Sequence, residues 1–266
     1  MRRVIFNQKG GVGKSTITCN LAAACAQLGK RTLVVDLDPQ ANTSQYLMGP
    51  ALESLELTAA DFFEQCLSFT FYPKSFDEFV VETPFENLDL LASSSVLTDI
   101  HDKLHSRYKL FKLREALEKV EGYDTIFIDT PAALNFYSLS ALVAAESCLI
   151  PFDCDKFSRS ALYTLIENLQ EIRQDHNNEL ELEGIVVNQY QARARLPQEL
   201  VNELQEEGLP VLEPYLSHSV KIRESHQKSK PMVFLSPRHK ISQQFIELFQ
   251  RLDGSFVAET ARQASA

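Results

Sequence analysis

Apolar positions form two kinds of segment along the chain, and their alternation predicts an α/β fold. Short uninterrupted apolar runs are typical of strands buried on both faces of a parallel sheet. We expect them at Val4–Phe6, Arg31–Asp38, Leu88–Ala92, Asp124–Pro131, Cys148–Phe152, Gly184–Asn188 and Leu209–Leu212. Longer segments predict helices at Ile17–Leu28, Tyr108–Val120, Leu134–Ala145, Arg159–Gln174, Leu196–Glu207 and about Ile241–Leu252. The pattern predicts a mostly parallel twisted sheet flanked by helices on both faces.

Residues 50–86 are the least regular part, and we expect short helices and turns on the rim of the sheet there. The segment is rich in phenylalanine, and a satellite core is favoured over a binding site for Phe62, Phe63, Phe69, Phe71, Phe76, Phe79 and Phe85. No repeat or linker interrupts the chain. We therefore expect one domain over residues 1–253 and a flexible tail at 254–266.

Composition narrows the class of protein. The 266 residues are 44% hydrophobic, which is ample for a core, yet no apolar run approaches the ~20 residues that span a bilayer. Two arginines lead directly into the first strand, so we expect no signal peptide. The five cysteines form no Cys-x-x-Cys pair. Reduced thiols in a cytoplasmic protein are therefore expected, in place of disulfides or a cysteine metal site.

A glycine-rich loop between the first strand and the first helix carries the strongest chemical signal. Residues 7–16 read Asn-Gln-Lys-Gly-Gly-Val-Gly-Lys-Ser-Thr. Backbone N–H groups of such a loop can face phosphate oxygens, with the positive end of the following helix behind them. Lys14 would add charge at the phosphates, and the Ser15 hydroxyl would serve Mg²⁺. Lys9 departs from the ordinary phosphate-loop pattern and is either a solvated lysine or a second phosphate contact.

Three acids follow predicted strands. Ligands of open parallel sheets sit outside the carboxyl ends of strands, where Asp36, Asp38 and Asp129 are expected. An apolar strand that ends in Asp is typical of a carboxylate that holds Mg²⁺, and Asp129 fits this best. Asp38 or Asp129 could also orient a water for attack on a γ-phosphate. Helix capping is the alternative role for each acid.

The net charge of −10 hides one basic segment. Residues 214–240 contain six bases and one acid, or +5, so the remaining 20 bases and 35 acids give −15. The bases are Lys221, Arg223, Lys228, Lys230, Arg238 and Lys240, and Arg193 and Arg195 form a smaller pair. Clustered bases of this kind favour contact with a nucleic-acid backbone. A solvated surface or contacts to a bound nucleotide remain the alternatives.

Three segments together resemble the ParA-type ATPases, the deviant-Walker group of P-loop NTPases that also includes MinD. They are the glycine loop at residues 7–16, the segment Val35–Asn42 and the segment Asp124–Pro131. Weaker similarity continues through Val186–Asn188 and Lys230–Pro231. The resemblance covers nearly the whole chain, and residues 50–86 are its weakest part.

The resemblance implies a role for each site residue. Lys9 corresponds to the lysine that reaches the phosphates of a partner subunit, and Asp38 to the acid that activates the attacking water. Ser15, Asp36 and Asp129 would lie at Mg²⁺. The expected contacts to ATP are Lys9, Gly10, Gly11, Val12, Gly13, Lys14, Ser15, Thr16 and, near adenine, Asn188.

The same resemblance places the basic residues on DNA. Lys221 and Arg223 match positions where partition ATPases bind DNA without sequence preference, and we extend this prediction to Lys228, Lys230, Arg193 and Arg195. His218 stands where many relatives have arginine, so the footprint on DNA is expected to differ.

The implied function is an ATP-dependent homodimer that binds DNA and positions a cargo, such as a plasmid, a chromosome region or a large protein assembly. A cargo-linked ParB-like or adaptor protein would stimulate hydrolysis, and the protein would associate with the bacterial nucleoid. A MinD-like membrane ATPase is the main alternative. It would require the apolar side of Ile241–Leu252 to bind lipid, whereas we expect that side to dock on the core. A metabolic ATP-using ligase or a reductase component on the same scaffold is the second alternative.

Overall fold

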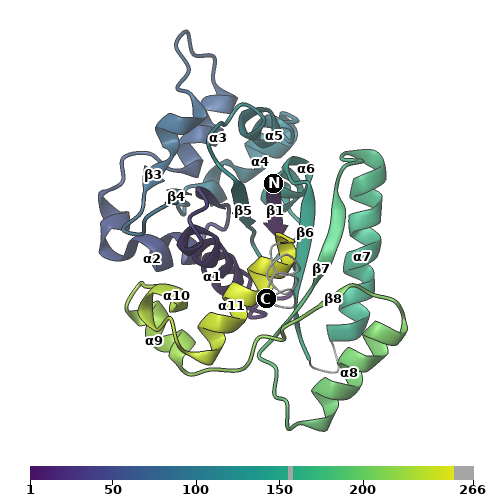
Figure 1. Cartoon of the computed structure of the whole chain (residues 1–266). Coiled ribbons are helices and arrows are strands. Elements are labelled where there is room, and N and C mark those ends of the chain that lie inside the picture. Colours follow the sequence, from purple (N-terminus) through teal and green to yellow (C-terminus); the bar gives the residue numbers. More distant parts are fainter. Residues whose placement is uncertain (155–157, 255–266) are drawn as a thin grey trace.

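One eight-stranded sheet organises the chain in the computed structural model, which describes residues 1–154 and 158–254 (Figure 1). The strand order is β3-β4-β2-β5-β1-β6-β7-β8, and every neighbouring pair is parallel except β3 and β4. The strands are β1 (Arg2–Ile5), β2 (Thr32–Asp36), β3 (Val81–Glu82), β4 (Leu88–Leu91), β5 (Thr125–Asp129), β6 (Ser147–Asp153), β7 (Glu181–Asn188) and β8 (Val211–Leu212). The predicted α/β fold is confirmed.

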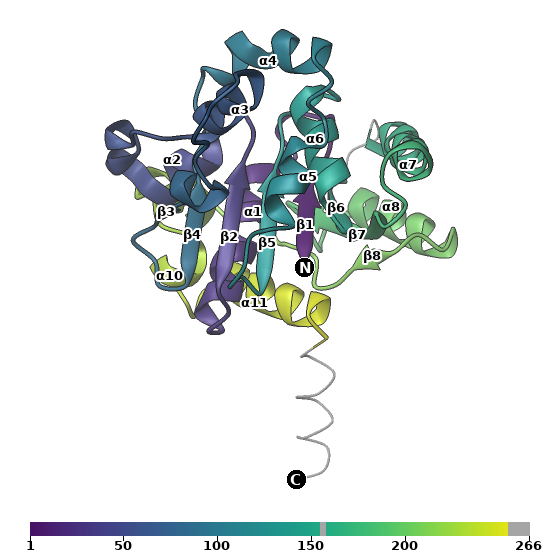
Figure 2. The same ribbon diagram turned by 90° about the horizontal axis from the view of Figure 1, so that it is seen from above.

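Helices cover both faces of the sheet because successive strand residues point to opposite sides. Val4 and Phe6 contribute to one apolar cluster and Ile5 to the other. The first cluster lies under α3 (Ala59–Leu67), α4 (Leu97–Ser106), α5 (Lys112–Leu117), α6 (Phe136–Ala144), α7 (Ser158–Asp175) and α8 (Arg195–Glu206). The second lies under α1 (Lys14–Gln27), α2 (Asn42–Met48), α9 (Lys221–Gln227), α10 (Met232–Leu235) and α11 (Lys240–Leu252). Figure 2 shows α3–α6 on one side of the strands and α10 and α11 on the other.

One predicted helix is wrong. The segment Tyr108–Val120 contains only the short α5, and a separate helix, α4, precedes it. Tyr108 adopts a left-handed φ of 55° between them. The guanidinium of Arg107 donates to the carbonyl of Leu67 at 2.7 Å, which fixes this turn from a distant part of the chain. No glycine or proline marks the break, so the apolar spacing alone suggested a continuous helix.

The phenylalanine-rich segment divides into a buried set and an exposed tip. Besides α3 it forms the 3₁₀ helices η1 (Gly49–Ser54) and η2 (Phe76–Phe79). The predicted satellite core is confirmed for Phe62, Phe63, Phe76 and Phe79. It is wrong for Phe69 and Phe71, which are 87% and 82% exposed on the loop that projects at the top of Figure 1.

The apolar side of α11 packs on α1 and not outward, as predicted. Ile241, Phe245, Leu248 and Phe249 are buried there. Among the described residues, no helix is both long and apolar enough to cross a membrane. The single domain over residues 1–253 stays a prediction, and residues 255–266 of the predicted tail lie outside the described residues.

Candidate functional site

Three adjacent strands bring the glycine loop and the acids to one edge of the sheet. β5 lies between β2 and β1, and its last residue, Asp129, pairs in register with Asp36 of β2 and Ile5 of β1. The loop at residues 7–13 starts where β1 ends and leads into α1. The local sequence therefore fixes a carboxylate pair directly beneath the loop.

The loop is open toward solvent and closed toward β7. Gly11 and Gly13 have φ of 77° and 93°, a region that favours glycine. A side chain on Gly13 would place its Cβ 2.3 Å from Nδ2 of Asn188, whereas a Cβ on Gly11 would meet no atom within 4 Å. Asn188 Nδ2 also donates to the carbonyl of Val12 at 2.8 Å. An anion can therefore approach the loop N–H groups and the start of α1 from the open side.

The two lysines of the loop differ in placement. Lys14 is buried, and its Nζ donates to the carbonyl of Lys9 at 3.3 Å. Burial lowers the pKa of Lys14, against the nearby charges of Asp129 and Asp38. The Lys9 ammonium lies at the end of β6 instead, where its Nζ is 3.0 and 2.9 Å from the carboxylate oxygens of Asp153. One lysine thus lies under the loop and the other at its rim.

Asp36 and Asp129 are fully buried acids facing one another. Burial, and then the charge of Asp129, raises the pKa of Asp36 to about 8, although Ser44 donates its N–H and hydroxyl to this carboxylate at 2.8 and 2.7 Å. Burial also raises the pKa of Asp129. Bonds from the hydroxyls of Thr43, at 2.7 Å, and Ser15 oppose that rise. Two carboxylates so placed are best stabilised by a cation.

The donor set fits Mg²⁺ bound together with phosphate. Within residues 1–154 and 158–254, no group of three His, Cys, Asp or Glu side chains could hold a metal alone. Mg²⁺ typically takes one or two protein oxygens and completes its shell with water and phosphate. The Ser15 hydroxyl lies near the Asp129 carboxylate, and the two groups supply such oxygens.

Asp38 lies two residues beyond β2, outside the buried pair. Its N–H donates to Asp36 Oδ1 at 3.1 Å, and its Oδ1 accepts from the N–H of Gln40 at 2.9 Å. It lines a cavity together with Lys14 and Ser15. This position is suited to holding a water, but the catalytic role of Asp38 stays a prediction.

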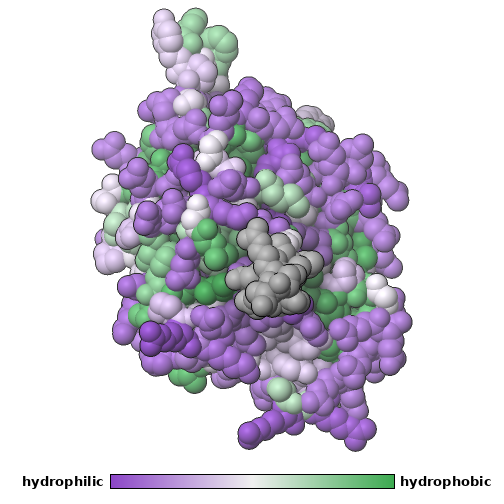
Figure 3. Space-filling model, viewed as in Figure 1, coloured by the Kyte–Doolittle hydropathy of each residue, from purple (hydrophilic) through white to green (hydrophobic). Residues whose placement is uncertain are grey.

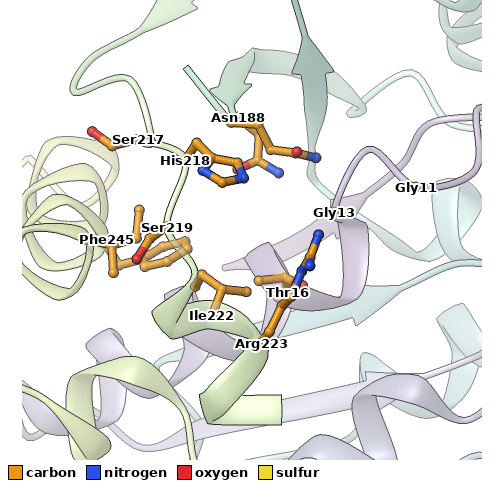
Figure 4. A pocket seen from close by; sticks show the side chains of 12 residues that line it. Gly11, Gly13, Thr16, Asn188, Ser217, His218, Ser219, Ile222, Arg223 and Phe245 are labelled. Carbon is orange, nitrogen blue, oxygen red and sulfur yellow. The ribbon is translucent and has the colours of Figure 1, made fainter. Parts of the chain in front are cut away.

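Two cavities meet at the loop and share Gly11, Gly13 and Thr16. One, of about 500 Å³, contains Lys14, Ser15 and Asp38 and is also lined by Tyr46 and His226. The other, of about 220 Å³, lies beneath Asn188 and is drawn in Figure 4. Its other walls are Gln189, Ser217, His218, Ser219, Ile222, Arg223, Ile241 and Phe245. Together they offer a polar end and an apolar end, as a nucleotide requires.

The basic residues predicted on DNA separate into groups. Lys221, Lys228 and Lys230 lie on α9 and the turn after it. Figure 3 shows that hydrophilic residues predominate on the face that it draws, with smaller hydrophobic areas between them. Lys221, Lys228 and Lys230 are all exposed. Arg193 and Arg195 are exposed beside the start of α8, which Figure 1 places well apart from α9. Arg223 instead lines the cavity under Asn188, which favours the nucleotide alternative for this residue.

Tyr46 and His226 line the nucleotide cavity, although the sequence did not predict a site role for either residue. The His226 Nε2 is 3.1 Å from the Thr16 hydroxyl, and its ring stacks on Tyr46 with centroids 4.2 Å apart. His226 follows Arg223 by three residues, so a helix predicted over 221–227 would have placed both on one face.

A glycine loop between a strand and a helix, with a buried carboxylate at the end of the adjacent strand, defines the class of P-loop nucleotide-hydrolysing proteins. The family described as "AAA domain" matches residues 3–182. The Bacillus subtilis sporulation initiation inhibitor protein Soj is 31% identical over 92% of this chain and 94% of its own length. The Myxococcus xanthus chromosome partitioning protein ParA is 31% identical over 93% of this chain and 86% of its own. The chain belongs to this AAA-domain family and is a ParA-type P-loop ATPase.

Solved structures agree on the fold. McdA of Cyanothece in complex with ATP superposes with a TM-score of 0.81 at 19% identity, covering 95% of this chain and 96% of McdA. The Mycobacterium smegmatis cobyrinic acid a,c-diamide synthase, with a bound ATP analogue and magnesium, gives 0.81 at 24% identity and covers 94% and 93%. Proteins with different names thus share this scaffold, and the fold alone does not assign a cargo or a substrate.

Proposed function

We propose that the protein binds Mg²⁺–ATP, dimerises around it and uses its hydrolysis to control attachment to DNA and the positioning of a cargo. Membership of the ParA-type ATPases supports the nucleotide and the positioning role. Soj and ParA are named for sporulation control and chromosome partitioning. The site geometry and the charge distribution support the dimer and the DNA contact.

The chain's own groups have distinct tasks in hydrolysis. The loop N–H groups and the Lys14 ammonium hold the phosphates and stabilise charge on their oxygens. Asp129 and Ser15 would hold Mg²⁺, which would offset negative charge on the phosphates. Asp38 orients the attacking water from the open side of the cavity. Asp36, bonded to Ser44 and to the N–H of Asp38, fixes the backbone that carries this carboxylate.

The position of Lys9 carries the dimer proposal. Lys14 already supplies the lysine beneath the loop, whereas the Lys9 ammonium lies at the rim with Asp153. A lysine on the rim can exchange this partly exposed ion pair for a phosphate bound to a second copy. The pair costs little to break, since partly exposed ion pairs contribute about 1 kcal/mol or less.

The exposed bases of α9 carry the DNA proposal. Lys221 and Lys228 follow the loop that walls the nucleotide cavity, on a chain that is otherwise strongly acidic. Bases that contact phosphate only would bind DNA of any sequence. A cargo-linked partner that stimulates hydrolysis would then release the dimer from the nucleoid.

Retention on DNA tests the proposal. The ATP-bound protein should bind unrelated duplexes equally, and the double variant Lys221→Glu, Lys228→Glu should lose most of this binding. The slope of log affinity against log salt should also flatten, by about 0.9 for each DNA phosphate that the variant no longer neutralises. The control Lys103→Glu, Lys119→Glu makes the same charge change on α4 and next to α5, on the opposite face.

Equal DNA binding by both double variants would refute the DNA contact at α9. Nucleotide-dependent sedimentation of the wild type with anionic liposomes would support the MinD-like alternative instead.

A further inference from the structure

The short helix α9 has two chemically different faces. Side chains three or four residues apart share a face of a helix. Ile222, Arg223 and His226 therefore form one face and line the cavities at the glycine loop. The other face carries Lys221, Glu224 and, at the C-cap, Lys228, with the Lys221 Nζ 2.6 Å from the Glu224 carboxylate. One helix thus presents one set of groups, its inner face, to the open nucleotide site, where Arg223 and His226 are exposed, and another set, its outer face, on the opposite side.

Arg223 directs a positive charge at the nucleotide cavity. Figure 4 shows its side chain extending from α9 toward Gly13 and Thr16. None of the described residues lining this cavity carries a carboxylate. The lining includes instead the loop glycines, a threonine and an asparagine. A guanidinium in such surroundings is suited to an anionic ligand, and a phosphate gives it a charge-assisted hydrogen bond.

His226 connects α9 to the helix that begins at the phosphate loop. Its Nε2 lies 3.1 Å from the hydroxyl of Thr16, two residues into α1. Partial burial lowers the pKa of His226, and its Nε2 gives or accepts this bond according to the tautomer. Thr16 lines both cavities, so its hydroxyl is available to a bound nucleotide as well.

Tyr46 connects α9 to α2, the helix that donates hydrogen bonds to the buried acids. Its ring stacks on His226, and its hydroxyl lies 2.6 Å from the hydroxyl of Ser225 on α9. Tyr46 belongs to α2, the helix whose first turns bond Asp129 through Thr43 and Asp36 through Ser44. α9 therefore contacts both elements that surround the phosphates.

A second bond network fixes the chain just after α9. The amide of Asn20 on α1 donates to the Tyr46 hydroxyl at 3.3 Å and accepts from the N–H of Met232 at 2.8 Å. Movement of α1 or α2 when the phosphates bind would thus be transmitted to the C-terminal half of α9 and to the chain that follows it.

We propose that the inner face of α9 is a nucleotide-binding element, in which Arg223 contacts a phosphate and His226 positions Thr16, so that bound nucleotide fixes the orientation of the basic outer face. This inference rests on the proposed nucleotide site and adds a direct link from it to the DNA-binding bases. The link is made within one subunit.

Nucleotide affinity tests the role of Arg223. Titration with a fluorescent ATP or ADP analogue should show about a tenfold or greater loss for Arg223→Ala, as for a hydrogen bond to a charged group. Arg223→Lys should recover part of the affinity, because lysine keeps the positive charge but lacks the paired N–H donors of the guanidinium. Arg173→Ala, which removes an exposed arginine from α7 on the opposite face of the sheet, is the matched control and should bind nucleotide as the wild type does. Wild-type affinity in Arg223→Ala would overturn the contact.

Hydrogen exchange tests the role of His226 without measuring hydrolysis. In the wild type, adding ADP or ATP should increase protection of amides in 221–227 as well as in the glycine loop. His226→Phe keeps a ring on Tyr46 but loses the bond to Thr16, so nucleotide should still protect the loop and no longer protect 221–227. His226→Gln, which restores a polar nitrogen, should recover part of that protection. Absence of protection at 221–227 in the wild type would refute the proposal even if a variant fails to fold.

The outcomes separate this inference from the proposed function. If α9 responds to nucleotide but Lys221→Glu, Lys228→Glu leaves DNA binding unchanged, the link stands and the DNA proposal fails. If DNA binding depends on these lysines while Arg223→Ala and His226→Phe behave as wild type, the inference fails alone.

Discussion

The buried pair of Asp36 and Asp129 predicts that the nucleotide-free protein loses stability as the pH rises through neutrality. The pKa of Asp36 is about 8 in the folded chain, against an ordinary value of 3.8. Between these values the folded state keeps a proton that the unfolded state has released. Stability therefore falls with rising pH across this interval, and the full penalty is present above pH 8.

The size of the change in unfolding free energy follows from the single proton that Asp36 keeps in the folded state. Each pH unit inside the interval costs about 1.4 kcal/mol of unfolding free energy. From about pH 5.5 to about 7.5 the loss attributable to Asp36 is thus about 3 kcal/mol, a large share of a typical domain's stability. Mg²⁺–ADP should reduce this loss, since a cation beside Asp129 favours ionised carboxylates.

Urea unfolding at about pH 5.5, 6.5 and 7.5 measures the effect. Asp36→Asn cannot ionise, so its unfolding free energy should change less with pH than that of the wild type, by about 1.4 kcal/mol per unit. The amide group of the new asparagine faces the hydrogen-bond donors of Ser44 and the N–H of Asp38. This lowers stability at every pH without altering how the unfolding free energy changes with pH. Asp102→Asn, at a fully exposed carboxylate, is the control and should keep the wild-type slope. Equal slopes for wild type and Asp36→Asn would refute the reasoning.

Three further substitutions test separate parts of the structure. Gly13→Ala places a Cβ 2.3 Å from the amide of Asn188 and should abolish binding of a fluorescent ATP analogue, and binding at wild-type affinity would contradict the loop geometry. Asp153→Asn removes the ion pair between Asp153 and Lys9, worth up to about 1 kcal/mol in each subunit, and should strengthen ATP-dependent dimerisation in sedimentation by up to about thirtyfold for the two subunits together; a weaker dimer would contradict this. Gly184→Ala places a Cβ 2.4 Å from Cγ of Leu212 on β8 and should lower the unfolding free energy, measured with urea, by about 1–3 kcal/mol without changing ATP affinity. An unchanged urea midpoint would contradict the packing of β7 on β8.

The sheet and the phosphate end of the site could be predicted because local sequence determines them. Uninterrupted apolar runs have few options other than central parallel strands, as in β2 and β5. A strand followed at once by glycines, a lysine and a helix leaves little freedom for the loop. The acids then meet Lys14 because parallel strands end at one edge.

Features set by distant contacts could not be predicted. The turn at Tyr108 depends on a bond from Arg107 to a carbonyl of α3. Phe69 and Phe71 lie on an exposed loop whose two ends are held together by the Gln65 side chain. This side chain donates to the carbonyl of Lys74 and accepts from its N–H. The place of Arg223 at the nucleotide cavity depends on the contacts of α9 with α1 and α2 through His226, which the charge of Arg223 alone did not reveal.

Sedimentation of the wild type and Lys9→Ala with ATP, ADP and no nucleotide tests the central claim most directly. The wild type should form a dimer with Mg²⁺–ATP and remain a monomer with ADP. Lys9→Ala should stay monomeric with ATP while still binding it, because Lys14 and the loop are intact. A dimer of Lys9→Ala equal to that of the wild type would contradict the account.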